Sequence, residues 1–149
     1  MSVTCDKFIG AFLAKVTEFE LSALAENVRQ ETVEGYMKRA ISSFKKICKY
    51  DLTTTYDDTR REFDVSIDEE ALDEIIDIVS EGMVVQWLKP YVYRQEILEN
   101  VLNTKDFTTY SPAELLLRVG NAYAKAQKDY TQMIREYSYN NGDLTELHL

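Results

Sequence analysis

Apolar residues recur at helical spacing along most of the chain. In residues 6–16, 32–49 and 111–139 they stand three and four positions apart, on one side of each expected helix. Such spacing is typical of amphipathic helices that bury one face. Strand-and-turn architectures need frequent turn residues, and the chain has only five Gly and two Pro. The sequence therefore predicts an all-α fold, a helical bundle of about four to five helices.

Capping signals set the expected helix boundaries. Asp6 is placed to cap the first helix. Ser66 opens an S-x-x-E sequence, in which the Ser hydroxyl and the Glu carboxylate each satisfy a free backbone N–H. Pro90 is expected to stop or kink the helix that follows, because it lacks an N–H and clashes with the preceding turn. Ser111, followed by Pro and Glu, predicts the start of a long last helix that ends at "NNGD".

Two segments fall outside the helical pattern. Residues 51–67 contain β-branched and turn-forming residues, and three apolar residues near their end alternate with polar neighbours. This pattern predicts a loop, an extended arm or a hairpin. Residues 140–149 are expected to form a flexible tail or to dock on a partner. The length of 149 residues fits a single domain over residues 1–149.

The negative charge of the chain is local. Residues 57–81 hold eleven acidic and two basic residues, which accounts for the whole net charge of −9 and leaves the remainder neutral. A surface of this kind repels the backbone of a nucleic acid and attracts basic protein surfaces.

Carboxylates gather on one side of the first turns of the helix expected over residues 66–88. This acidic face consists of Glu70, Asp73, Glu74, Asp77 and Glu81. Three interpretations stay open: a solvated helix face, a docking face for a basic partner, and a hard-cation site at Asp73, Asp77 and Glu81. The cation site is the least favoured, because calcium sites usually add carbonyl ligands from a bent loop.

The second half of the same helix is apolar on nearly every side. Val84, Val85, Trp87 and Leu88 lie close together in the sequence, and a helix that is apolar all round is buried in a core or against another chain. Because a bundle of this size has limited room for a wrapped helix, we expect these residues to contact a neighbouring subunit or another partner. Burial in the chain's own core is the alternative.

The last expected helix carries a basic face on its back. This face consists of Arg118, Lys125, Lys128 and Arg135, mixed with acidic residues. In a single chain it would be a solvated face. In a ring of copies it would meet the acidic face of the next subunit.

The residues that catalytic and metal sites need are scarce. The only His is His148, which stands at the end of the sequence. A His-based metal cluster needs more than one His, and a His in that position is a poor member of a Ser-His-Asp triad, so neither is expected within one subunit. There is no phosphate-binding glycine motif, and Cys5 and Cys48 lack a CxxC spacing. No apolar run is long enough to span a membrane. The sequence predicts a protein that is not an enzyme, with no cofactor, no metal and two packed thiols.

Residues 87–126 contain the short motifs "WLKP", "KDF" and "YSPAELL", and "REYSY" follows near the end of the last helix. This order of motifs and helices, over residues 30–140, resembles the head–tail connector proteins of tailed phages that infect Gram-positive bacteria. These are neck adaptor or head-completion proteins. The resemblance rests on packing and capping motifs and brings no catalytic residues.

The resemblance implies a structural role in the virion neck, after assembly in the host cytoplasm. The chain would form a homo-oligomeric ring of about twelve copies, closed by rotation. The ring would join the portal protein to a downstream neck or tail-terminator protein and extend the DNA channel. DNA would pass through without specific binding, and no membrane is involved.

A second hypothesis does not depend on the resemblance. The chain would be a small acidic helical binding module, which docks on or inhibits a basic protein partner by mimicking a nucleic acid. It predicts a monomer whose binding weakens with salt.

Overall fold

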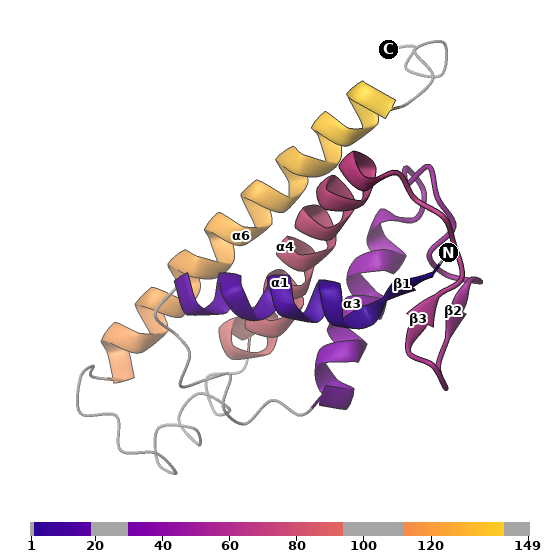
Figure 1. The fold of residues 1–149 in the computed structure, drawn as a ribbon. Helices are drawn as coiled ribbons and strands as arrows, with labels where there is room; N and C mark the ends of the chain where they lie inside the picture. Colours follow the sequence, from indigo (N-terminus) through magenta and orange to yellow (C-terminus); the bar gives the residue numbers. More distant parts are fainter. Residues whose placement is uncertain (1, 19–29, 94–111, 142–149) are drawn as a thin grey trace.

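The computed structural model describes residues 2–18, 30–93 and 112–141, which form a mostly helical fold (Figure 1). The described helices are α1 (Cys5–Glu18), α3 (Gln30–Phe44), α4 (Glu69–Tyr93) and α6 (Pro112–Asn141). The described strands are β1 (Val3–Thr4), β2 (Tyr56–Asp57) and β3 (Glu62–Phe63). The predicted helical bundle with a short hairpin is therefore confirmed. Residues 19–29 and 94–111 lie outside the described residues, as does the tail beyond residue 141.

Helix α4 is the centre of the fold, because α6, α3 and α1 all pack against it. Figure 1 shows α6 and α4 running side by side in opposite directions, with α1 crossing them. The helices approach one another closely at Gly82 of α4. A Cβ atom there would lie 2.8 Å from the Tyr130 ring of α6 and 2.9 Å from the Ala40 Cβ of α3. Tyr130 also donates a hydrogen bond of 3.1 Å to the Ala40 carbonyl, which joins α6 to α3.

The core is rich in large side chains. Trp87 is fully buried at its centre, and the Phe12 ring of α1 meets it edge-on with centroids 6.0 Å apart. Tyr137 of α6 is buried against Phe44, with ring centroids 4.9 Å apart, and its hydroxyl accepts a 3.0 Å hydrogen bond from the Lys49 backbone N–H. These contacts tie the two ends of the described chain to α3 and α4.

The three strands form a small antiparallel sheet in the order β1-β3-β2. Val3 and Tyr56 both pair with Phe63, which is 1% exposed and packs on Phe8. Residues 58–61 close the hairpin, where the Asp57 carboxylate accepts the backbone N–H groups of residues 59 and 60. Arg61 adopts a φ of 56°, a left-handed conformation that turns the chain into β3. The alternation in residues 51–67 therefore resolves into a hairpin, and β1 is an addition that the sequence did not predict.

Several helix boundaries differ from the sequence prediction. Helix α1 begins at Cys5, directly after β1, so Asp6 lies inside its first turn and does not precede it. Helix α3 ends at Phe44, whose carbonyl accepts the N–H groups of both Ile47 and Cys48 in a closing turn. The residues expected in its last turn, including Lys45, therefore lie beyond it.

Helix α4 differs from the prediction at both ends. It begins at Glu69, and its first bond runs from the Leu72 N–H to the Asp68 carbonyl at 2.7 Å, so Ser66 does not cap it. It also continues through Pro90 to Tyr93. Of the two expected effects of Pro90, a stop or a kink, the stop is therefore wrong, and the kink stays a prediction. Packing of the apolar second half outweighs the lost hydrogen bond at the proline.

Candidate interaction surfaces

Six exposed carboxylates lie where the hairpin leads into α4. We call this surface the acidic patch; it consists of Asp64, Asp68, Glu69, Glu70, Asp73 and Glu74. Within the described residues, no ion pair joins any of them to a basic side chain. The positive end of the α4 dipole stabilises the carboxylates of its first turn, so the patch can persist without basic neighbours. It contains three of the five residues of the predicted acidic face.

The other two residues of that face bind Lys15 of α1. The Lys15 Nζ lies 2.8 Å from Asp77 Oδ1 and 2.9 Å from Glu81 Oε2. Glu81 is 6% exposed, so the prediction that it faces outward is wrong, whereas Asp77 is exposed. Burial lowers the pKa of Lys15, but the hydrogen bonds that its ammonium donates to the two carboxylates outweigh this effect, and the pKa is raised. This ion triad fixes α1 across α4.

The apolar residues expected at a subunit contact lie inside the chain. Val84, Trp87 and Leu88 are fully buried and Val85 is 7% exposed. The preferred interpretation, that they contact a neighbouring subunit, is therefore wrong for this fold, and the alternative of plain core holds. The core has room for a wrapped helix because α1, α3 and α6 surround α4 on several sides.

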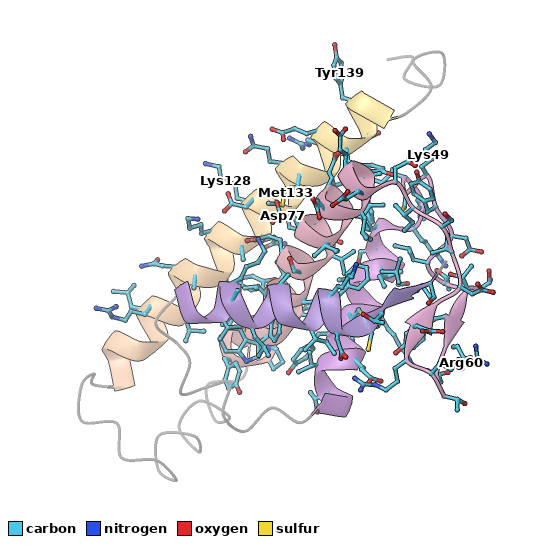
Figure 2. The ribbon with its side chains drawn as sticks, viewed as in Figure 1. Lys49, Arg60, Asp77, Lys128, Met133 and Tyr139 are labelled. Atoms are coloured by element: carbon cyan, nitrogen blue, oxygen red, sulfur yellow. The ribbon has the colours of Figure 1, made fainter. Side chains whose placement is uncertain are left out.

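The outward side of α6 is exposed and basic. Arg118, Lys125, Lys128 and Arg135 all lie there, and Figure 2 shows Lys128 pointing away from the body of the fold. Lys125 binds Asp129 one turn on, at 3.1 Å, whereas no ion pair of Lys128 or Arg135 occurs in the described part of the chain. Leu117 and Tyr139, 64% and 71% exposed, extend this side toward the two ends of α6.

The buried thiols are poorly suited to chemistry. Cys5 is fully buried and Cys48 is half-buried, both are free, and burial raises the pKa of each. A raised thiol pKa lowers the fraction of reactive thiolate at neutral pH. Across the described ranges, no group of three or more His, Cys, Asp or Glu side chains is arranged to hold a metal ion. None of the described helices has the length and apolar character to cross a membrane.

Sequence reasoning located the acidic and basic surfaces but missed the triad around Lys15. The signal was present, because Lys15 stands between core positions of an amphipathic helix, where a cation needs a partner. Its two partners, Asp77 and Glu81, lie 62 and 66 residues away in the sequence, and only the packing of α1 on α4 identifies them.

The chain was also compared with known proteins. No family model, no curated protein and no solved structure matches it.

Proposed function

We propose that this chain is a structural subunit of a phage neck, a head–tail connector that assembles into a ring between the portal and the tail. The resemblance of residues 87–126 to such proteins suggests the role. The observation that carries the proposal is the presence, on one rigid fold, of two exposed surfaces of opposite charge. These are the acidic patch on the start of α4 and the basic side of α6.

A closed ring needs two different surfaces that complement each other, because each subunit contacts its two neighbours through opposite sides. The acidic patch of one copy and Lys128 and Arg135 of the next supply that complementarity. Tyr139 and Leu117 add apolar contact area on α6, and Tyr is enriched at protein interfaces. Charge pairs of this kind set register and association rate more than affinity.

Excess carboxylates also suit a channel for DNA. A basic lining would hold DNA by releasing counterions from its phosphates, whereas an acidic lining lets it slide. Carboxylates that are not used between subunits would serve this purpose if they face the lumen.

The mass of the native particle tests the proposal first. Native mass spectrometry or light scattering would be applied to the protein alone and mixed with phage portal protein. We expect a closed ring, or a monomer that joins the portal at a fixed stoichiometry. A monomer that does not bind the portal at any concentration tested would contradict the connector proposal.

A charge swap tests which surfaces meet. Glu70→Lys with Asp73→Lys should weaken assembly at least roughly tenfold, and Lys128→Glu with Arg135→Glu should do the same, since each places like charges opposite one another. Combining all four changes should restore assembly. Asp77 and Glu81 are left unchanged because they hold Lys15. If the combined variant assembles no better than either pair, these two surfaces do not contact each other.

The acidic patch also supports the second candidate, a binding module for a basic protein. Its six exposed carboxylates have no ion pair within the described residues. In that case the Glu70→Lys and Asp73→Lys variant would lose a salt-sensitive partner, whereas reversal of Lys128 and Arg135 would change nothing.

A further inference from the structure

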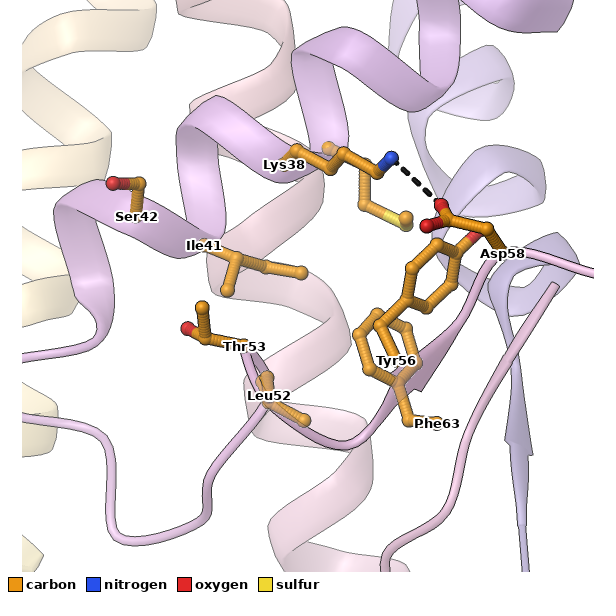
Figure 3. A pocket seen from close by; sticks show the side chains of 9 residues that line it. Lys38, Ile41, Ser42, Leu52, Thr53, Tyr56, Asp58 and Phe63 are labelled. Carbon is orange, nitrogen blue, oxygen red and sulfur yellow. Dashed lines mark hydrogen bonds and ion pairs between the residues drawn. The ribbon is translucent and has the colours of Figure 1, made fainter.

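A pocket opens between α3 and the hairpin. Its volume is about 330 Å³, and its floor is apolar, formed by Met37, Ile41, Leu52 and Phe63. Figure 3 shows Ile41 and Ser42 of α3 on one side and Tyr56 and Phe63 on the other. This volume is at the lower end of the range of small-molecule sites, about 300–1,000 Å³, and it is large enough to take an apolar side chain of a partner.

The strand beside the pocket has an unused edge. β2 is the outer strand of the sheet. The Asp64 N–H donates to the Thr55 carbonyl at 2.9 Å, and hydrogen-bonded pairs alternate along an antiparallel ladder. The pair of Tyr56 with Phe63 is therefore a non-hydrogen-bonded one, and the Tyr56 N–H and C=O point away from β3.

The same alternation agrees with the other side of the sheet. The Cys5 N–H donates to the Arg61 carbonyl at 3.0 Å, which makes Val3 and Phe63 a hydrogen-bonded pair in the ladder with β1. The N–H and C=O groups of Phe63 thus bond to β1. Those of Tyr56 have no partner strand. No hydrogen bond to the Tyr56 backbone is found among the described residues.

The surroundings of this edge are acidic. Asp57, Asp58, Glu62 and Asp64 lie on the hairpin, against Lys38, Arg60 and Arg61. Arg60 lies 3.9 Å from Asp57 Oδ2 and 4.0 Å from Glu62 Oε1. Lys38 binds Asp58 at 2.9 Å at the pocket rim, and Arg61 is engaged by Glu34 and Asp6. Together with Glu34 and Asp6, six carboxylates lie here against three bases, and Asp64 has no ion pair within the described residues. An occupant with basic residues on either side of an apolar one is therefore favoured by charge.

We propose that this groove binds an extended segment of a partner protein as an added strand. One residue of the segment would exchange both backbone hydrogen bonds with Tyr56 and place its apolar side chain, of about the size of Leu, in the pocket. Basic residues beside it would face the acidic hairpin. Strand addition of this kind takes affinity from the backbone and specificity from alternate side chains. The site is independent of the connector proposal and stands if that proposal fails.

Three synthetic peptides separate the parts of the proposal in an NMR titration of the full chain. The probe is Ac-Lys-Thr-Leu-Thr-Lys-amide. Replacing its central Leu by Asn should weaken binding roughly tenfold, since the apolar burial is lost. N-methylation of the same Leu should abolish binding, because it removes the donor to the Tyr56 carbonyl. Shifts should centre on the amides of Thr53 and Tyr56.

A matched pair of variants tests the location. Ser42→Trp fills the mouth of the pocket and should abolish binding of the Leu peptide. Thr32→Trp is the control, because Thr32 is also exposed on α3 but does not line the pocket. Circular dichroism confirms that both variants remain folded.

Three results would overturn the proposal: no saturable shift at millimolar Leu peptide, equal binding of the N-methylated peptide, or binding that survives Ser42→Trp. Equal binding of the N-methylated peptide would mean that the pocket takes a side chain without strand addition.

Discussion

At the scale of single residues, the fold depends on positions where closely packed neighbours leave no space for a larger side chain. Gly82 is such a position, because the Tyr130 ring and the Ala40 side chain leave no space for a Cβ atom. The ring has no freedom to retreat, since its hydroxyl is bound to the Ala40 carbonyl. Glycine costs helix stability elsewhere, but here it permits three helices to approach one another.

We predict that Gly82→Ala destabilises the protein. Overpacking costs about 1–3 kcal/mol against a gain in helix propensity of about 1 kcal/mol, so we expect a net loss of up to about 2 kcal/mol. Urea unfolding followed by circular dichroism measures the difference. Gly10→Ala is the matched control, because nothing lies within 4 Å of its new Cβ, and it should raise stability by about 0.5–1 kcal/mol. Stabilisation by both changes would show that α4 and α6 can separate at no cost.

Lys15 is the second such position, because it holds a nearly buried carboxylate. Lys15→Met should lower the free energy of unfolding by about 1–3 kcal/mol, since Glu81 loses its partner and stays buried. Adding Glu81→Gln should recover much of that loss. Lys125→Met is the control: its pair with Asp129 is exposed on both sides, and such pairs contribute about 0.3–0.5 kcal/mol. Equal effects of the two methionine changes would contradict the role of the triad.

At the scale of elements, α4 shows tertiary packing outweighing a local signal. Its first half is amphipathic, its second half is apolar all round, and Pro90 lies within the helix three residues before its end. A proline there removes one backbone hydrogen bond and crowds the preceding turn. The helix continues because its neighbours bury the turn before it, where Trp87 and Leu88 are fully buried.

We predict that Pro90→Ala stabilises the chain. The new N–H can bond to the carbonyl of residue 86, and the gain is bounded by the difference in helix propensity, about 3 kcal/mol. Thermal unfolding followed by calorimetry measures this gain in stability. A lower midpoint for the alanine variant would mean that the pyrrolidine ring contributes packing that outweighs the missing bond.

At the scale of the whole molecule, several buried and half-buried tyrosines make the fold sensitive to alkali. Burial raises the pKa of Tyr130 to about 12 and that of Tyr137 to about 12. Burial also raises the pKa of Tyr56. The unfolded chain ionises these phenols near pH 10, whereas the folded chain keeps them neutral. Their contribution to stability is therefore complete below pH 10 and is lost as the pH rises from there toward 12.

We predict a steep fall in the free energy of unfolding above pH 10. Each tyrosine contributes at most about 1.4 kcal/mol per pH unit to the slope. Tyr130→Phe and Tyr137→Phe should each reduce the slope, although each loses some stability at pH 8 with its hydrogen bond. Urea unfolding from pH 8 to 11.5 measures it. The exposed Tyr139 provides a control through Tyr139→Phe, and a slope unchanged in both buried variants would contradict the prediction.

The sequence determined the features that follow from local patterning. The spacing of apolar residues determined the helical class, the Ser-Pro-Ala-Glu signal placed the start of α6 at Pro112, and the charge count located the acidic segment. These three predictions agree with the structure because helix periodicity, capping and local charge depend on residues within a few positions of one another.

Only the tertiary structure decided what each face contacts. It buried Val84, Val85 and Leu88 within the chain, turned Glu81 inward to Lys15 and carried α4 through Pro90. It also paired β1 with β3, from residues some 60 positions apart. These four outcomes have one physical reason. The free energy of a buried group depends on residues that are distant in sequence, and no local pattern specifies which distant residues pack against it.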